Sequence, residues 1–366
     1  MVHFDVPQML RRVFRSWHHR RCVHAACGAA IALLMLGPAR VVGRAAGEAP
    51  IRGYWITRDS LDSLDAIRRS VASARANALD TVFVPITLTD GDNVPHGFDG
   101  VRECIREARE RGLHVQAWID VNRVARVDEF PASRAHVIYE HPEWLMIPRE
   151  LASAMMSIDP RGPAYLGQLS RWTRANQSRI DGLYISPLDP DAASYLTKLL
   201  TATVQRYVVD GVYLDALRFP GSDFDYSRHA MDLFRADARP RLPIRERARL
   251  DEIEAIDPFG YVSEFPTQWT NFRETRLTAL ITRVHAALKT VNPSLTITVN
   301  IPVDDGSARE EHFQDWRSWI AARLVDGVGR RSGNTTTVVL SSDGVVSGSA
   351  ISPPNGPVAA AGGGSR

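Results

Sequence analysis

Along positions 51–328, short stretches with the apolar pattern of strands alternate with longer segments that have the apolar spacing of helices. This pattern predicts strands that alternate with helices. Six short, mainly apolar stretches have the length of strands, and they cover 51–57, 81–87, 114–121, 210–217, 295–301 and 325–329. Longer segments with helical spacing lie between them, at 61–78, 100–112, 164–178, 190–206, 268–289 and 310–324. Because strand and helix alternate, we expect parallel strands joined by right-handed crossovers.

The two faces of the expected strands differ in chemistry, which separates a closed barrel from a flat, doubly wound sheet. Side chains alternate between faces, so the strand 114–121 carries Val115, Ala117, Ile119 and Val121 on one face and His114, Gln116, Trp118 and Asp120 on the other. A doubly wound sheet has helices on both sides and needs two apolar faces. One aliphatic face and one polar, aromatic face instead favour an α/β fold of the (β/α)8 TIM type, with about six of its strands present.

The first 46 residues have the layout of an export signal. A basic stretch precedes the compact apolar run Ala25–Leu36, and small residues follow the breaker Gly37-Pro38. The run is short for a membrane span, although an uncleaved anchor is the alternative reading. We therefore expect a secreted or periplasmic protein that meets the membrane only through this signal, with a mature chain that begins between Arg40 and Gly47.

Charge and cysteine usage exclude several classes of protein. The whole chain has a formal charge of +2, but residues 1–46 hold seven Arg and one Asp, so the remainder carries 37 basic and 41 acidic residues. A basic surface for nucleic acid is therefore not expected. Cys104 is the single cysteine after residue 46, so no internal disulfide is expected. His141 and Glu143 lack a third ligand at metal-site spacing, and neither a metal nor a cofactor is predicted.

The last 38 residues, 329–366, differ from the rest of the chain. They contain eight Gly and no aromatic residue, which is typical of a low-complexity, disordered tail. Two β-prone stretches, 335–342 and 344–351, could pair with an open edge of the barrel, but a parallel partner needs a crossover of about a dozen residues. The predicted organisation is a signal at 1–46, a barrel at 47–328 and a disordered or loosely packed tail at 329–366.

Several motifs resemble those of the glycosyl-hydrolase-like 10 family, exported bacterial proteins with a (β/α)8 barrel that are presumed to hydrolyse glycosidic bonds. They are HPEWL at 141–145, SPLDP at 186–190 and RYVVDGVYLDALRFP at 206–220, within a resemblance that covers 51–328. The family signature D-G-x-H-x-D-Y-x-R-Y-P is matched by Asp210, Gly211, Asp215, Arg218 and Pro220. It is not matched by Tyr213, Ala216 and Phe219. The shortened carboxyl end is a second departure, which suggests a truncated barrel.

Asp215 is the candidate catalytic residue, because strand parity turns it inward at the carboxyl end of a barrel strand. Glycoside hydrolysis uses two carboxyl groups, and Asp215 is expected to be the nucleophile or base, held ionised by Tyr213 and Arg218. The alternative is a structural carboxylate that pairs with Arg218 or caps the next segment. The acid partner stays open among Asp120, Asp304, Asp305 and Glu264.

Aromatic and polar residues at the same strand ends predict a sugar-binding surface. The expected substrate-binding residues are Trp118, Asp120, Asn122, Tyr213, Arg218 and Asn300. The prediction is a glycoside hydrolase acting on a bacterial polysaccharide, with peptidoglycan glycan as one candidate suggested by the family and the compartment. The alternative is a non-catalytic, carbohydrate-binding or inactive barrel.

Overall fold

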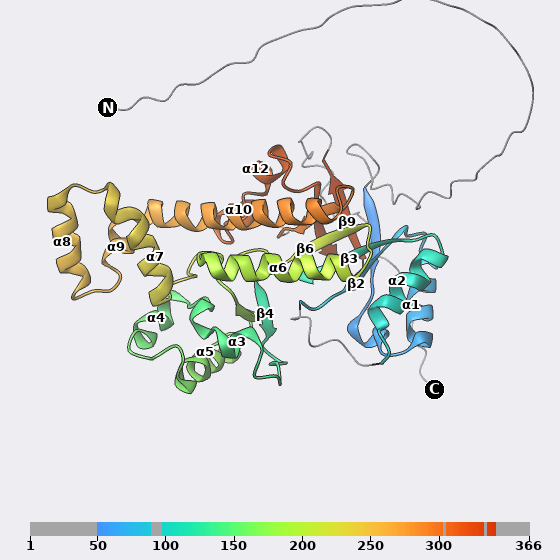
Figure 1. Ribbon diagram of the computed structural model, residues 1–366, viewed down its shortest axis with the longest axis horizontal. Helices are drawn as coiled ribbons and strands as arrows, with labels where there is room; N and C mark the ends of the chain where they lie inside the picture. Colours follow the sequence, from blue (N-terminus) through green and yellow to red (C-terminus); the bar gives the residue numbers. More distant parts are fainter. Residues whose placement is uncertain (1–49, 89–96, 303–304, 333–334, 342–366) are drawn as a thin grey trace, which may run out of the picture. The chain divides into compact units, whose positions relative to one another are not determined.

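The computed structural model describes residues 50–88, 97–302, 305–332 and 335–341, and these residues form a closed barrel with helices around it (Figure 1). Seven strands follow one another around the barrel: β1 (Ile51–Trp55), β2 (Thr81–Pro85), β3 (His114–Asp120), β6 (Gly211–Asp215), β7 (Thr296–Asn300), β8 (Gly327–Ser332) and β9 (Thr335–Leu340). The first six pair in parallel, as the alternating pattern predicts. The export signal predicted at 1–46 lies outside the described residues.

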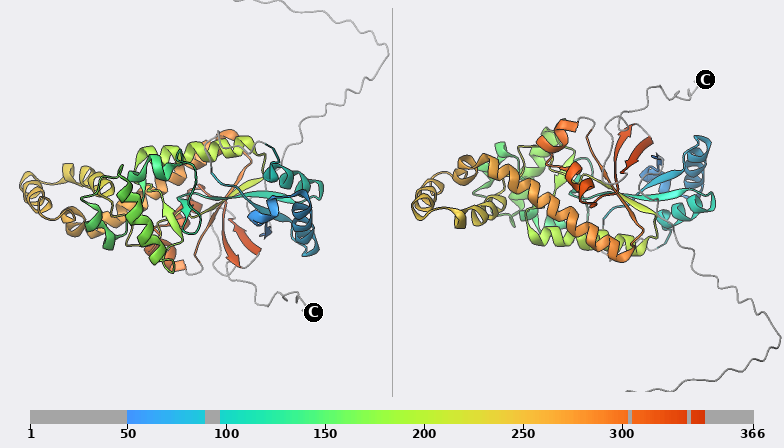
Figure 2. Two further views of the ribbon diagram at one scale, coloured as in Figure 1. Left: turned by 90° about the horizontal axis from the view of Figure 1, so that it is seen from below. Right: turned by 90° about the horizontal axis from the view of Figure 1, so that it is seen from above.

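Helices follow the parallel strands and cover the outside of the barrel. They include α1 (Leu64–Ala76), α2 (Gly100–Glu110), α6 (Pro190–Arg206), α10 (Pro266–Val291), α11 (Asp305–Glu310) and α12 (Trp316–Ala321). Ser63, Asp99 and Asp189 accept hydrogen bonds from backbone amides in the first turns of α1, α2 and α6, as N-cap residues do. The long helices α6 and α10 pack side by side (Figures 1 and 2). None of the described helices is long and apolar enough to cross a membrane.

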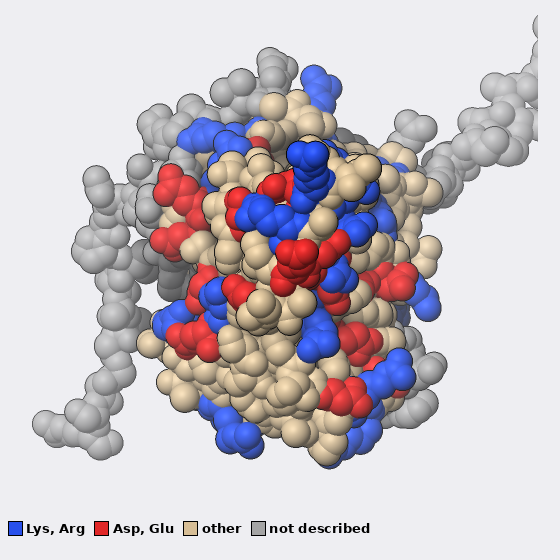
Figure 3. Space-filling view, turned by 90° about the vertical axis from the view of Figure 1, so that its left-hand side faces the viewer, with Lys and Arg blue, Asp and Glu red and all other residues tan. Residues whose placement is uncertain are grey.

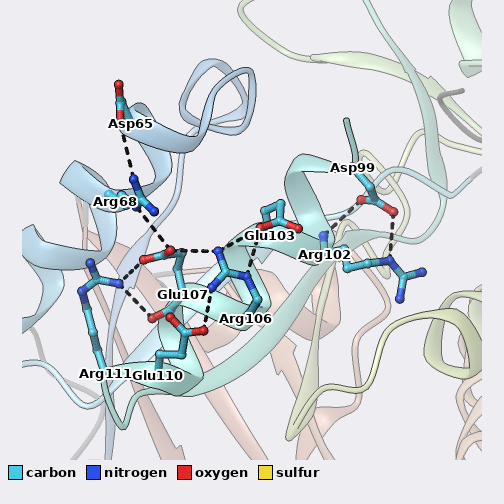
Figure 4. Close-up of polar contacts among 9 residues, drawn as sticks. All are labelled: Asp65, Arg68, Asp99, Arg102, Glu103, Arg106, Glu107, Glu110 and Arg111. Carbon is cyan, nitrogen blue, oxygen red and sulfur yellow. Dashed lines mark hydrogen bonds and ion pairs between the residues drawn. The ribbon is translucent and has the colours of Figure 1, made fainter. Parts of the chain in front are cut away.

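An ion-pair cluster joins α1 to α2 on the outer surface (Figure 4). Glu107 is buried and pairs with Arg68 of α1 and with Arg106 and Arg111 of the α2 region. The hydrogen bond from Arg111 holds the pKa of Glu107 below its ordinary value. A buried carboxylate needs such partners because burial alone would favour its neutral form. The cluster therefore has a structural role in fixing the two helices.

Two long insertions follow the carboxyl ends of β3 and β6. The first contains the antiparallel pair β4 (Arg123–Arg126) and β5 (Gly182–Tyr184) together with α3 (Val137–Glu140), α4 (Arg149–Met155) and α5 (Pro163–Ala175). The second contains α7 (Arg228–Ala238), α8 (Ile244–Glu254) and α9 (Gly260–Glu264). Arg and acidic side chains are interspersed on the end of the molecule seen in Figure 3. The charged stretch 239–254 belongs to this solvated helical region, with Arg239 paired to Asp251.

The interior of the barrel is filled by aromatic rings, and this agrees with the difference between strand faces. Trp55, Phe83 and Tyr213 pack together, with ring centroids 4.9 Å apart for Trp55–Phe83 and 5.1 Å for Phe83–Tyr213. Gly53 and Gly329 leave room for these rings, because a Cβ at either position would lie 2.2 Å from Phe83 or 2.7 Å from Tyr213. The aliphatic faces pack outward against the helices.

The prediction that 329–366 forms a disordered or loosely packed tail is wrong for the part that the structure describes. Strand β9 pairs antiparallel with both β8 and β1, and it closes the barrel that six parallel strands would leave open. Only residues 333–334 separate β8 from β9, and a hairpin needs no crossover. Trp55 Nε1 donates to Thr336 Oγ1 at 2.7 Å across the β1–β9 pair. Residues 342–366, including the β-prone stretch 344–351, lie outside the described residues.

The fold is thus an incomplete (β/α)8-type barrel, with six parallel strands and one antiparallel strand that closes the ring. The carboxyl ends of the parallel strands, where barrel enzymes place their chemistry, face the two insertions.

Candidate active site

Asp215 ends β6, and three donors hold its carboxylate. Trp118 Nε1 donates to Oδ2 at 3.0 Å, while Asn300 Nδ2 and the Ala216 amide donate to Oδ1 at 2.8 and 2.7 Å. Ala216 has a φ of 48°, a left-handed conformation that is uncommon for alanine, so the chain turns sharply after Asp215. Donors from β3, β7 and the β6 end therefore fix the orientation of this carboxylate.

Tyr213 acts on Asp215 through Asn300, not directly as the sequence suggested. The Tyr213 hydroxyl donates to Asn300 Oδ1 at 2.9 Å, which turns the amide so that its Nδ2 faces Asp215. Tyr213 itself is fully buried among the interior rings. A direct substrate contact for Tyr213 therefore finds no support in the structure, whereas Asn300 is half-buried at the strand end.

Asp120 is the carboxylate next to Asp215. The two residues are register partners at the carboxyl ends of the parallel strands β3 and β6. Arg123 Nη2 donates to Asp120 Oδ2 at 2.7 Å, while Asp120 Oδ1 is enclosed and has no hydrogen-bond partner among the described residues. The side chain of Asp120 is 16% exposed.

The environment of Asp120 favours its protonated form. Burial raises the pKa of Asp120, and the negative charge of Asp215 raises this pKa further, although Arg123 and Arg58 act in the opposite direction. A carboxyl group with a raised pKa beside a second carboxylate is the pattern of an acid–base pair in hydrolases. The structure therefore brings together two of the residues that the sequence singled out.

Trp118 and Arg218 lie at the same strand ends but have different surroundings. Trp118 is half-buried, and its ring meets Trp55 edge to face with centroids 4.6 Å apart. Arg218 hydrogen-bonds to the ring of His312 and, among the described residues, forms no ion pair with Asp215. Neither a hydrogen bond by which Arg218 would hold Asp215 ionised nor the alternative of a structural ion pair between the two is therefore seen among the described residues.

His312 is a residue that the sequence did not single out. Its Nδ1 donates to the Phe219 carbonyl at 2.8 Å, so Nε2 accepts from Arg218 at 3.3 Å. Burial lowers the pKa of His312 to about 4, and the charge of Arg218 adds to this effect. The ring is therefore neutral at neutral pH and fixes the segment after β6. A lone histidine between helical segments carries no sequence signal for such a role.

Asn122 does not reach the surface of the site. It is fully buried, and its Nδ2 donates to the Ile185 carbonyl at 3.0 Å. The side chain ties the end of β3 to the segment after β5, which is a structural role. The prediction that Asn122 binds substrate used strand position alone, and strand position does not show which loops cover a residue.

Of the other candidates for the acid, Glu264 is not beside Asp215. Glu264 belongs to α9 and pairs with Arg249 at 2.9 Å, in the helical end of the second insertion. Asp304 lies outside the described residues, and Asp305 begins α11. Asp120 is therefore the carboxylate that the described structure pairs with Asp215.

Metal ligands do not cluster in the described ranges, where no three His, Cys, Asp or Glu side chains could hold an ion. His141 Nδ1 lies 3.0 Å from Glu143 Oε1, and its ring stacks on Trp144 with centroids 3.8 Å apart. The motif HPEW is thus a packed corner of the first insertion.

Known proteins resemble this chain in sequence and in fold. Residues 85–331 match the family model described as Glycosyl hydrolase-like 10. The protein named glycosyl hydrolase DigH of Escherichia coli K12 is 22% identical over 244 residues, which cover 63% of this chain and 45% of that protein. A DigH sequence of Shigella flexneri matches equally. The chain therefore spans less than half the length of the curated relatives it matches.

Solved structures share the barrel at low identity. A GH42 β-galactosidase from G. stearothermophilus is 12% identical with a TM-score of 0.51, over 80% of this chain and 41% of that chain. The PgaB glycoside hydrolase domain from Bordetella bronchiseptica is 14% identical with a TM-score of 0.49, over 77% of this chain and 74% of that domain. The likeness to the β-galactosidase shows the fold alone.

Proposed function

The chain belongs to the glycosyl hydrolase-like 10 family, and from that premise we propose that it hydrolyses glycosidic bonds with the carboxyl pair Asp120 and Asp215. The proposal rests on the register of β3 and β6, which places two carboxyl groups with different surroundings at adjoining strand ends. Hydrolysis of a glycosidic bond needs such a pair, one group protonated and the other ionised.

Asp120 is the proposed general acid. Its raised pKa keeps a proton available above the ordinary carboxyl range, and Arg123 occupies Oδ2, so the proton belongs on Oδ1. A turn of the carboxyl group toward the adjoining cavity would bring this proton to the glycosidic oxygen. The leaving sugar then departs with that proton as the bond between the anomeric carbon and the oxygen breaks.

Asp215 is the proposed nucleophile or base. Three donors orient its carboxylate and stabilise its negative charge, as a group that attacks the anomeric carbon or activates water requires. The half-buried ring of Trp118, which donates to this carboxylate, supports packing against a sugar ring.

A bacterial polysaccharide is the proposed substrate, and peptidoglycan glycan is the first to test. The family supports a carbohydrate substrate. The apolar run Ala25–Leu36 behind a basic stretch supports export to the compartment where such polymers lie. Amino-terminal sequencing of the exported protein tests the export proposal. We expect a start between Arg40 and Gly47, and intact residues 1–21 on the exported chain would contradict it.

Incubation of the purified chain with peptide-free peptidoglycan strands and with other bacterial polysaccharides tests the enzymatic proposal. We expect new reducing ends and shorter glycans by mass spectrometry on at least one polymer. Binding of a glycan without any new reducing end would instead favour a non-catalytic carbohydrate-binding barrel.

A further inference from the structure

A cavity of about 630 Å³ opens beside Asp120. Its walls come from the segment after β2 at 86–88, from β4 and the loop up to Val137, and from α6. Ile86, Phe130 and Leu196 give it apolar surface. A volume of this size lies within the range of small-ligand sites. Because Asp120 is part of the wall, a sugar next to the bond that Asp120 protonates has room in this cavity.

Three arginines line the cavity, and two of them have carboxylate partners. Arg123 pairs with Asp120 and Asp181, and Arg126 Nε donates to Asp128 at 3.2 Å. Arg58 differs, because its Nη1 donates to the neutral hydroxyl of Thr87 at 2.5 Å and it forms no ion pair among the described residues. The guanidinium of Arg58 is exposed at the cavity wall and retains donors for an anion.

We propose that this cavity is a subsite for a sugar that carries an anionic group, and that Arg58 recognises this group. The inference rests on the proposed hydrolase function, because it places the charged sugar beside the bond to be cleaved. A guanidinium matches the two oxygens of a carboxylate with two parallel hydrogen bonds. The apolar wall can meanwhile cover the carbon face of the sugar ring.

The position of Arg58 connects recognition to the acid. Arg58 lies close enough to Asp120 for its charge to lower the pKa of that carboxyl. Glu129 is an acidic residue in the wall of the same cavity. It belongs to the loop after β4, whereas Arg58 follows β1 and contacts the segment after β2, so the two side chains come from different parts of the wall. An anion held by Arg58 therefore lies near the scissile bond and offsets the charge that opposes protonation of Asp120.

Binding to the Asp215→Asn chain tests this subsite without any need for hydrolysis. The probe is a tetrasaccharide of alternating N-acetylglucosamine and N-acetylmuramic acid, compared by calorimetry with the same compound after its carboxyl groups are reduced to alcohols. We expect the acidic form to bind about tenfold more tightly, as a charge-assisted hydrogen-bond pair would give. Arg58→Gln in the same background should remove this preference.

Arg126→Gln is the matched control, because it removes a second arginine from the same cavity that already has the partner Asp128. We expect it to keep the preference for the acidic tetrasaccharide. Equal affinity for both probes, no binding of the acidic probe, or an equal loss in both arginine variants would overturn the inference. Failure of the hydrolase proposal would be seen in the reducing-end assay, as an absence of cleavage by the unsubstituted chain.

Discussion

Asp120 and Asp215 stand side by side at the carboxyl ends of β3 and β6, and only Asp120 also contacts an arginine among the described residues. Trp118, Asn300 and a backbone amide hold Asp215 instead. The contact with Arg123 by itself would favour an ionised Asp120, but burial and the negative charge of Asp215 raise the pKa of Asp120 in spite of it. A raised pKa beside a second carboxylate is what the proposed acid role requires.

Asp120→Asn should lower cleavage of a natural glycan by about 10²–10⁴-fold, the usual contribution of a general acid. The loss should largely disappear on a dinitrophenyl glycoside, whose leaving group departs without a proton. Because Asp120 must be protonated, activity of the unsubstituted chain should fall as pH rises through its raised pKa. Initial rates across pH measure both effects. An equal loss on the two substrates, with the descending limb of the pH profile retained, would contradict the role.

Removal of β9 should open the barrel. A chain that ends after Ser332 loses Val338 and Leu340 from the interior cluster and the hydrogen bond from Trp55 to Thr336. Burial of two aliphatic side chains contributes about 3 kcal/mol or more, so thermal unfolding should shift down by several degrees or the chain should aggregate through its open edges. A chain that ends after Ser341 is the control and should unfold like the full chain. Equal unfolding midpoints for the two truncations would show that β9 is dispensable.

The alternation of strand faces was enough to predict the barrel and the inward positions of Trp118, Asp120 and Asp215. Side chains on a strand have only two faces, so parity locates a residue once the strand is found. Parity does not show what covers the strand end. Tyr213 fills the interior and Asn122 lies beneath the segment after β5, and neither environment is visible in strand position.

The sequence marked 335–342 as β-prone, but the low-complexity composition and the missing crossover led us to predict a tail and not strand β9. The stretch Thr335–Leu340 alternates between half-buried and buried positions, which is a strand pattern, but no helix precedes it. An antiparallel return needs only a short turn, so the missing crossover did not exclude pairing. Arg58 was not singled out from the sequence, because it lies in a short 3-10 helix after β1 and the cavity that it lines is built mostly by distant segments, including β4 and α6.

Asp225 offers a test of stability against pH. It is fully buried, and burial raises its pKa to about 6, although amides of Ile147 and Ser227 donate to its Oδ1. A raised carboxyl pKa means that the folded protein binds the proton more tightly than the unfolded chain. This contribution to stability is complete below the ordinary carboxyl pKa and is lost as pH rises to about 6.

Asp225→Asn should therefore reduce the loss of stability between pH 4 and pH 7, by on the order of 2–3 kcal/mol. The amide can still accept both backbone bonds, and Ser227 Oγ can accept from its Nδ2. Urea unfolding across this pH range measures the difference. Parallel pH profiles for the Asp225→Asn and unsubstituted chains would contradict the assignment.

The most direct test of the hydrolase account compares the two ends of one strand. Asp215 ends β6 at the proposed site, whereas Asp210 precedes it at the opposite end and accepts a hydrogen bond from the Val115 amide at 2.7 Å. Initial rates of reducing-end formation are measured on a cleavable glycan for the unsubstituted, Asp215→Asn and Asp210→Asn chains, with folding checked by circular dichroism. We predict a loss of about 10³-fold or more for folded Asp215→Asn and near-normal activity for Asp210→Asn. Near-full activity in folded Asp215→Asn would contradict the account.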